Sequence, residues 1–113
     1  MNCVFCNIIE GSIPAKKVYE DDLVLAFYDI EPQAPVHVQI IPKKHITSMN
    51  DVTEADHGII AAIHAAAREI AKKLEIDQTG YRLINNCGQD GGQVVFHLHF
   101  HLLGGKNLGP LIS

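Results

Sequence analysis

The chain contains the stretch His97-Leu98-His99-Phe100-His101-Leu102-Leu103, in which imidazole and apolar side chains alternate. Successive side chains of a β-strand point to opposite faces of a sheet. The pattern therefore predicts a strand with its histidines on one face and Leu98, Phe100 and Leu102 on the other. A lone histidine in a strand is commonly a half-buried structural residue. Several histidines in strict alternation indicate a functional site, because each buried imidazole loses solvation and needs its own hydrogen-bond partner.

Neighbouring imidazoles on one strand face start about 6.6 Å apart, twice the rise per residue. Two positive charges at that spacing repel by roughly 2.5 kcal/mol at an effective dielectric constant of 20. We therefore expect at least one imidazole to be neutral near pH 7 and available as a nucleophile, base or metal ligand. The array alone does not separate phosphate chemistry from metal binding.

A glycine-rich segment, Gly88-Gln89-Asp90-Gly91-Gly92, precedes the histidines. Glycines adopt positive φ and let backbone N–H groups approach an anion closely. A plain hairpin turn is the alternative interpretation. Next to the histidines, the segment favours a phosphate site.

The rest of the chain predicts a single α+β domain over residues 1–113, with a mostly antiparallel sheet. Strands are expected over 18–20, 23–29, 36–41, 81–85 and 94–103, with a hairpin turn at Asp21-Asp22. A long helix is expected from Asp51 to Leu74, because Asp51 and Glu54 match a capping box and apolar residues then recur every three or four positions. A short helix is expected from Cys3 to Glu10.

Composition excludes several classes of protein. The 113 residues carry a net charge of −4, so the chain has no cationic field for nucleic acid, which is not expected as the main partner. Its apolar stretches fall short of the roughly 20 residues that span a bilayer, and no membrane partner is expected. The N-terminus lacks a signal-peptide pattern, so we expect a cytoplasmic protein whose 3 cysteines are thiols or metal ligands.

The stretch from His97 to Leu103 resembles the histidine triad pattern, His-φ-His-φ-His-φ-φ, of the HIT superfamily. The wider chain resembles the bacterial type of its Hint branch, the histidine triad nucleotide-binding proteins. The matching segments include Ile13-Pro14-Ala15-Lys16, Asp29-Ile30, Pro32-Gln33-Ala34-Pro35, Ile41-Pro42-Lys43-Lys44-His45-Ile46 and Gly91-Gly92-Gln93. The resemblance implies a HIT-like fold with a five-stranded sheet, one long and one short helix, and a homodimer with a continuous sheet.

The same resemblance implies a hydrolase of purine nucleoside phosphoramidates that needs no catalytic cofactor. His99 would attack phosphorus to form a nucleotidyl-histidine, His101 would contact the phosphate, and His97 and His37 would complete the cluster. The products would be a nucleoside 5′-monophosphate, of AMP or GMP type, and an amine. The alternatives are a dinucleoside polyphosphate hydrolase of the Fhit branch, a non-catalytic nucleotide-binding or partner-binding protein, and a three-histidine catalytic zinc site.

Further residues match nucleotide-binding positions of the family. Asp29 would accept hydrogen bonds from the ribose hydroxyls, and the phosphate would contact Asn86, Gly92 and Val94. The purine would lie among four apolar positions, namely Phe5, Ile8, Phe27 and Ile30. Many family members carry serine in place of Val94, and the tail from Lys106 to Ser113 lacks the tryptophan of some members. Both departures leave the preference for the leaving amine open.

A metal centre is the last expectation. Cys3-x-x-Cys6 alone is a modest signal, which two core cysteines would also produce. With two later histidines it supplies a Cys₂His₂ ligand set for structural zinc. The resemblance to bacterial Hint-like proteins assigns His45 and His97 to that set. Cys87 receives no assignment, and His57 and His64 are expected on the helix surface.

Overall fold

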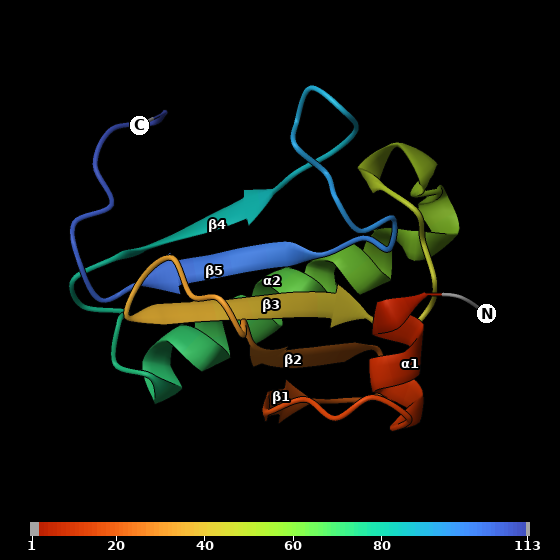
Figure 1. Cartoon of the computed structure of the whole chain (residues 1–113), viewed down its shortest axis with the longest axis horizontal. Helices are drawn as coiled ribbons and strands as arrows, with labels where there is room; N and C mark the ends of the chain where they lie inside the picture. The colour runs from red at the N-terminus through yellow and green to blue at the C-terminus, as the bar shows by residue number, and fades with distance from the viewer. Residues whose placement is uncertain (1–2, 113) are drawn as a thin grey trace.

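A five-stranded antiparallel sheet forms the centre of the molecule, as seen in a computed structural model that describes residues 3–112. The strand order is β1-β2-β3-β5-β4, and Figure 1 shows the sheet with β4 at the top and β1 at the bottom. The bounds are Lys17–Glu20 for β1, Val24–Tyr28 for β2, Val36–Pro42 for β3, Tyr81–Asn85 for β4 and Phe100–Gly104 for β5. The α+β class and the antiparallel sheet are confirmed.

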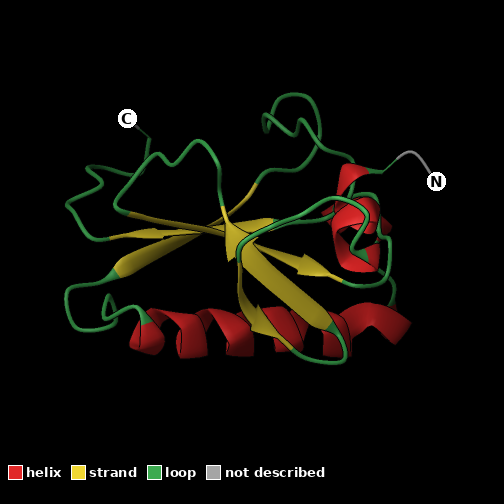
Figure 2. Ribbon diagram, turned by 60° about the horizontal axis from the view of Figure 1, so that its bottom comes forward, coloured by secondary structure: helices red, strands yellow, loops and turns green. Residues whose placement is uncertain are grey.

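Two helices lie on opposite sides of the sheet. The long helix α2, His57–Lys73, runs along one face, and the short helix α1, Val4–Glu10, lies on the other side at one end (Figure 2). The α2 side holds the main core, in which Ile63 and Ile70 of the helix are fully buried. The α1 side holds a smaller cluster made of Phe5, Ile8, Leu25, Phe27 and Ile41. No helix of the described residues is long and apolar enough to cross a membrane.

The histidine stretch obeys the predicted alternation of faces. Leu98, Phe100 and Leu102 are buried in the core beneath α2. The three histidines that alternate with them therefore point to the other side of the sheet. The expected strand from Val94 is too long, however, because β5 begins only at Phe100. Before Phe100 the chain bonds outside the ladder: Leu98 N–H donates to the carbonyl of Ile46, and the Asn85 side chain donates to the carbonyl of His99.

The predicted start of the long helix at Asp51 is wrong, since α2 begins at His57. The capping box uses Thr53 and Asp56 instead of Asp51 and Glu54, and it initiates a 3₁₀ turn. Asp51 accepts a hydrogen bond from the Ser48 hydroxyl in an earlier turn. The two 3₁₀ turns cover Met49–Asp51 and Glu54–Asp56.

Candidate active site and metal centre

Three histidines meet on the face of the sheet opposite α2. His37 lies on β3, His101 on the adjacent strand β5, and His99 directly before β5. The ring of His101 is 5.1 Å from the ring of His99 and 5.1 Å from that of His37, measured between centroids. His37 and His99 are buried, at 6% exposure each. The structure thus assembles an imidazole cluster from segments more than 60 positions apart.

The protein backbone fixes the tautomer of His99. Its Nδ1 lies 2.8 Å from the carbonyl oxygen of His97. A carbonyl only accepts, so Nδ1 carries the hydrogen and donates it. The neutral ring then has its lone pair on Nε2, which is the atom that a nucleophilic histidine uses.

A second backbone contact fixes the tautomer of His37. The backbone N–H of Gln33 donates to its Nδ1 at 3.0 Å, so the proton of the neutral ring resides on Nε2. That Nε2 lies 2.9 Å from Nδ1 of His101 and donates to it. The remaining nitrogen of His101, Nε2, therefore bears a hydrogen that is free to donate to a ligand.

His101 is electrically neutral at pH 7. Burial, with further contributions from the neighbouring His99 and His37, lowers its pKa from 6.5 to about 4. His101 therefore offers a hydrogen-bond donor to an incoming anion, and its ring brings no positive charge before the anion binds.

Asp29, directly after β2, is held by three neighbours. Its Oδ1 accepts from the backbone N–H of Glu31 at 2.8 Å, and its Oδ2 accepts from Nε2 of Gln39 at 2.9 Å. Nε2 of His37 lies 3.4 Å from the same Oδ2. Gln39 faces this site because it is registered directly opposite His101 in the sheet. Within residues 3–112, its buried Oε1 has no hydrogen-bond partner.

The glycine-rich segment forms a turn beside the histidines. Gly88 and Gly92 have φ of 73° and 78°, as expected, whereas Gly91 needs glycine for a different reason. A Cβ on Gly91 would lie 2.3 Å from the carbonyl oxygen of Cys87. Gln93 was not among the expected site residues. Its side chain closes the turn by accepting from Gly88 N–H and donating to the carbonyl of Thr47.

The residues expected around the phosphate and the purine lie in two kinds of environment. Asn86 donates its side-chain amide to the carbonyl of Gly91 and so braces the turn. Val94 and Ile30 are 84% and 95% exposed and are available to a ligand. The other three apolar positions belong to the buried cluster on the α1 side: Phe5, Ile8 and Phe27.

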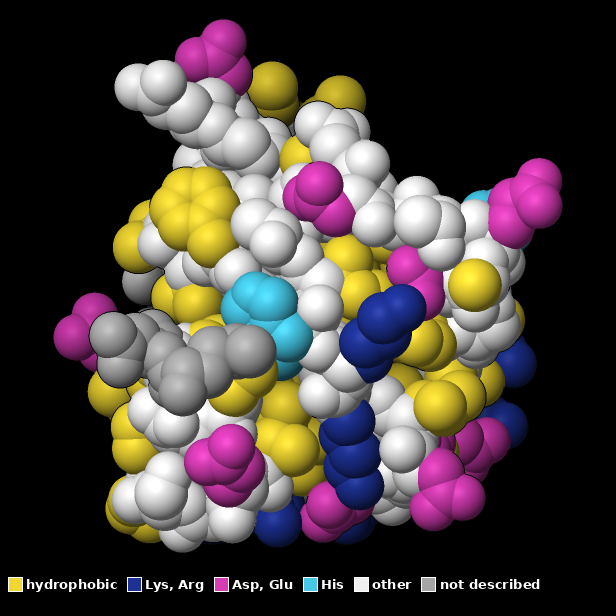
Figure 3. Space-filling model, turned by 90° about the vertical axis from the view of Figure 1, so that its right-hand side faces the viewer, with side chains coloured by type: hydrophobic (Ala, Val, Ile, Leu, Met, Phe, Trp, Pro, Cys, Tyr) yellow, Lys and Arg dark blue, Asp and Glu magenta, His cyan; other side chains and the backbone are white. Residues whose placement is uncertain are grey.

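A second cluster brings four metal-binding side chains together at the α1 end. Nδ1 of His97 lies 3.3 Å from Sγ of Cys3, 3.6 Å from Sγ of Cys6 and 3.1 Å from Nδ1 of His45. Sγ of Cys6 lies 3.4 Å from Nδ1 of His45. Zinc bonds of about 2.0–2.3 Å at tetrahedral angles place donors about 3.3–3.8 Å apart. The three distances to sulfur fall within this range, and the 3.1 Å between the two imidazole nitrogens is about 0.2 Å short of it. Figure 3 views this end of the molecule, where histidine reaches the surface among hydrophobic side chains.

The hydrogen bonds of His97 suit a metal ligand. Its Nε2–H donates to the carbonyl of Pro42 at 2.9 Å, which leaves the lone pair of Nδ1 facing the cluster. Burial, together with the nearby His45 and His99, lowers the pKa of His97 and keeps the ring neutral. Burial and the adjacent Cys3 raise the pKa of the Cys6 thiol, and a bound dication supplies the opposing charge that stabilises a thiolate.

Asp29, His37 and His101 also lie close enough together to suggest a metal site. The tautomer of His37 opposes one there. Its Nδ1 accepts from Gln33 N–H, so its proton occupies Nε2, the atom that would have to bind the ion. The two clusters therefore have different chemistry: the cysteine cluster presents lone pairs, and the Asp29 cluster presents a directed set of hydrogen bonds.

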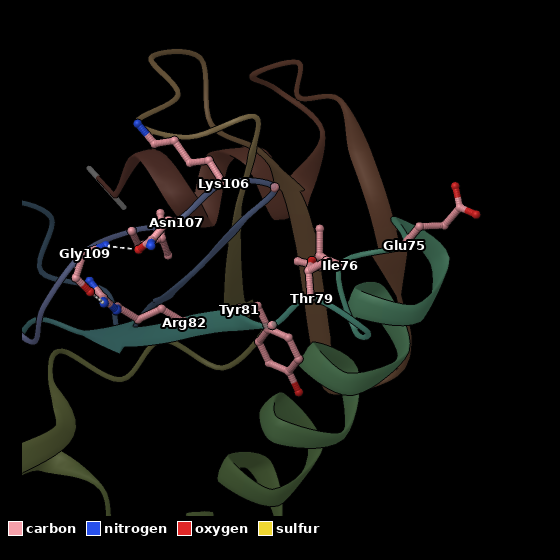
Figure 4. Close-up of a pocket in the computed structure, with 11 residues that line it drawn as sticks. Glu75, Ile76, Thr79, Tyr81, Arg82, Lys106, Asn107 and Gly109 are labelled. Atoms are coloured by element: carbon pink, nitrogen blue, oxygen red, sulfur yellow. Dashed lines mark hydrogen bonds between the residues drawn. The ribbon is translucent and has the colours of Figure 1, made fainter.

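A pocket of about 700 Å³ lies at the far end of β4 and β5, and no histidine lines it. Figure 4 shows that Arg82 and Asn107 reach the backbone of Gly109 there. Arg82 Nη2 donates to the Gly109 carbonyl, and Gly109 N–H donates to Asn107 Oδ1, each at 2.8 Å. These two bonds hold the tail against β4.

Comparison with known proteins identifies the family of the chain. The family model of the HIT domain matches residues 10–108. A relative from Escherichia coli strain K12 named purine nucleoside phosphoramidase is 46% identical over 110 residues, which cover 97% of this chain and 92% of the relative.

Two solved structures share the fold. A histidine triad protein from Clostridium difficile has a TM-score of 0.95 and 53% identity, covering 97% of this chain and 96% of its own. A HIT family hydrolase from Legionella pneumophila has a TM-score of 0.93 and 49% identity, covering 96% of each chain.

Proposed function

The chain belongs to the HIT domain family and is a hydrolase of that family, and on this premise we propose that it cleaves purine nucleoside phosphoramidates. The products are a nucleoside 5′-monophosphate and an amine. The observation that carries the proposal is the tautomer of His99, whose Nδ1–H is bonded to the carbonyl of His97 so that the lone pair occupies Nε2. The name of the Escherichia coli relative supports the substrate class.

The reaction proceeds in two displacements. In the first, Nε2 of His99 forms a bond to phosphorus while the P–N bond breaks, and the amine leaves with the electron pair and takes a proton from solvent. The hydrogen bond from Nδ1 to the carbonyl of His97 stabilises the positive ring of the intermediate. In the second, water forms the new P–O bond, His99 departs as a neutral ring, and the proton of the water returns to solvent.

The other histidines stabilise the transferring phosphoryl group. His101 donates a hydrogen bond from Nε2 to a phosphoryl oxygen. His37 orients the ring of His101 by donating a hydrogen bond to its Nδ1. The turn at Gly92, the adjacent Val94 and the side chain of Asn86 complete the phosphate site. Val94 offers no hydroxyl to the departing amine, so the amine must take its proton from outside that position.

The nucleoside lies next to this phosphate site. The carboxylate of Asp29 accepts hydrogen bonds from the ribose hydroxyls. The exposed side chain of Ile30 packs on the purine from the solvent side. Beneath the purine lie three apolar side chains, those of Phe5, Ile8 and Phe27.

The decisive experiment combines a turnover assay with a search for the covalent intermediate. Adenosine 5′-phosphoramidate is expected to yield AMP, and mass spectrometry of quenched turnover should detect a nucleotidylated peptide containing His99. His99→Ala should abolish both signals. Micromolar AMP binding without turnover indicates a binding protein instead, and faster cleavage of diadenosine polyphosphates indicates the Fhit-type activity. Turnover that never produces the adduct and stops on chelation indicates a zinc hydrolase.

We also propose that Cys3, Cys6, His45 and His97 hold a structural zinc ion. The support is the donor spacing, the neutral ring of His97 and its second bond to Pro42. Zinc at this position would attach α1 to the sheet. Protein purified without a His tag should contain near-stoichiometric zinc, and Cys3→Ser/Cys6→Ser should lose the ion and part of the stability.

The assembly and location follow as further proposals. The chain forms a homodimer by pairing the exposed edge of β4, the last strand of the sheet, with the same edge of a second copy. Sedimentation should give twice the monomer mass at micromolar concentration. The protein resides in the cytoplasm, where a reducing environment keeps cysteine ligands as thiolates. Cell fractionation checks this location.

A further inference from the structure

We infer that the cluster of Cys3, Cys6, His45 and His97 positions the His99 nucleophile, so that occupancy of the cluster by a metal determines the orientation and tautomer of His99. The inference rests on the proposed role of His99 and on the proposed zinc. It assigns the metal ligands a task in the reaction besides holding α1. Two separate contacts carry it, one through the backbone and one through an aromatic ring.

The backbone contact runs through His97. This fully buried residue presents Nδ1 to the cluster, donates from Nε2 to Pro42, and accepts the Nδ1–H of His99 at its own carbonyl. One residue therefore belongs to both sites. A rotation of its ring that shifts its peptide therefore displaces the acceptor that holds the hydrogen of His99 in place.

The segments carrying the two histidine ligands are also joined to each other. Leu98 N–H donates to the carbonyl of Ile46 at 2.6 Å, one residue beyond each histidine ligand. The peptide between His97 and His99 is thus fixed on one side by the segment of His45. A cation shared by His45 and His97 strengthens the same connection.

The aromatic contact runs through Phe5. This residue lies on α1 between the two cysteine ligands, and its ring packs edge-on against His99, with centroids 5.2 Å apart, and against His97 at 5.7 Å. Helix α1 has only 7 residues, and isolated helices of fewer than about 12 are marginal in water. The position of Phe5 therefore depends on what anchors α1 at Cys3 and Cys6.

The arrangement of donor atoms explains why occupancy matters. Nδ1 of His45 and Nδ1 of His97 lie 3.1 Å apart. Two lone pairs at that distance repel each other unless a cation or a shared proton lies between them. When the metal leaves, the contact persists only if one ring places its own hydrogen between the two nitrogens, and otherwise one ring turns away. A turn of the His97 ring that shifts its peptide moves the carbonyl that holds His99.

The test compares zinc-loaded and chelator-stripped protein by NMR of the histidine side-chain nitrogens, with kinetics alongside. Zinc-loaded protein should show His99 as a single Nδ1–H tautomer. Stripped protein should show a mixture of tautomers, and its kcat should fall about 10- to 100-fold with KM little changed, because displacement of a reacting group by about 1 Å costs that much. Restoring zinc should restore both signals. An unchanged tautomer and kcat after stripping would overturn the inference, as would failure to bind zinc.

Variants separate the metal from general loosening of α1. Cys3→Ser and Cys6→Ser should reproduce the stripped protein. Cys87→Ser removes a thiol outside the cluster and should match the wild type. Ile9→Ala weakens the packing of α1 while all four ligands remain, and it should keep the single tautomer. Loss of that tautomer in Ile9→Ala with zinc retained would contradict control by the metal. The NMR signal needs no turnover, so absence of phosphoramidase activity would refute the proposed function and still leave this coupling measurable.

Discussion

The hydrogen bond between His37 and His101 has only one possible direction. Nδ1 of His37 is occupied by the backbone N–H of Gln33, so Nε2 of His37 must donate and Nδ1 of His101 must accept, across 2.9 Å. A backbone amide in the loop before β3 thus determines the hydrogen that His101, on the adjacent strand β5, presents to a ligand. The buried His37 on β3 therefore has a specific role, because it fixes which nitrogen of His101 carries the hydrogen.

Removal of His37 should therefore impair catalysis more than binding. His37→Ala leaves His101 without its donor, and kcat is expected to fall about 10- to 100-fold because His101 is no longer held in one orientation. His37→Gln can still donate an amide N–H toward His101 and should recover part of the loss. Steady-state kinetics on adenosine 5′-phosphoramidate measures both. Equal kcat values for His37→Ala and wild type would refute the positioning role.

The lowered pKa of His101 predicts acid sensitivity of the fold. Its pKa is about 4 in the folded protein against 6.5 ordinarily, so between these values the unfolded chain binds a proton that the folded protein does not. Stability contributed by the neutral ring is present above pH 6.5 and is lost as the pH falls toward 4. Urea unfolding at several pH values should show a steeper loss in wild type than in His101→Gln. Other acid-sensitive groups, including His97, are the same in both proteins, so parallel curves would contradict the assignment.

Alternation in the sequence was sufficient to predict the faces of the sheet. Leu98, Phe100 and Leu102 lie beneath α2 as expected, because only apolar side chains fit a face covered by a helix. The start of β5 was not predictable from this pattern. Extended backbone before Phe100 has the same alternation as a strand, and only the position of Asn85 at the end of β4 shows where pairing stops.

The start of α2 was predicted wrongly for a related reason. Two overlapping sets of acidic and hydroxyl residues satisfy the capping pattern, and the choice of Thr53 with Asp56 is stabilised by Lys44, whose Nζ lies 2.7 Å from the Asp56 carboxylate. That contact comes from the segment after β3, so local spacing contains no information on it.

The site was predictable in its residue types and less so in its connections. His37 and Gln39 alternate with Val38 and Ile40, and this spacing could have indicated that Gln39 shares the face of His37. The directed bond from His37 to His101 depends on the register of β3 against β5, which no local pattern specifies. The contact between Phe5 and His99 depends likewise on where α1 docks.

Two glycines should respond in opposite ways to replacement by alanine. Gly91→Ala introduces a Cβ 2.3 Å from the Cys87 carbonyl and should cost about 1–3 kcal/mol of unfolding free energy while distorting the phosphate turn. Gly58→Ala lies in α2 with no atom within 4 Å of the new Cβ, and it should stabilise the protein by about 0.5–1 kcal/mol. Urea denaturation of both variants checks the signs. A Gly91→Ala protein as stable as wild type would show that the turn can relax.

Gln39 offers a test of how Asp29 and His37 are kept apart. Gln39→Leu removes the donor to Asp29 Oδ2, at a cost of about 1.5–3 kcal/mol, but also removes the unpartnered Oε1, which relieves about 1–3 kcal/mol. The two effects oppose each other, so stability should change by no more than about 2 kcal/mol. The activity should still fall, because Asp29 then competes with His101 for the single Nε2–H of His37, which lies 3.4 Å from Oδ2.

Gln39→Glu keeps the shape of the side chain but places a second carboxylate beside Asp29. Repulsion should make this variant less stable than Gln39→Leu, and the deficit should shrink as the pH falls from 7 to 5, because one shared proton then relieves the pair. Unfolding measured at both pH values distinguishes the variants. If Leu and Glu at this position gave the same stability at pH 7, the amide of Gln39 could not be acting on the charge of Asp29. The orphaned Oε1 would then reflect packing alone.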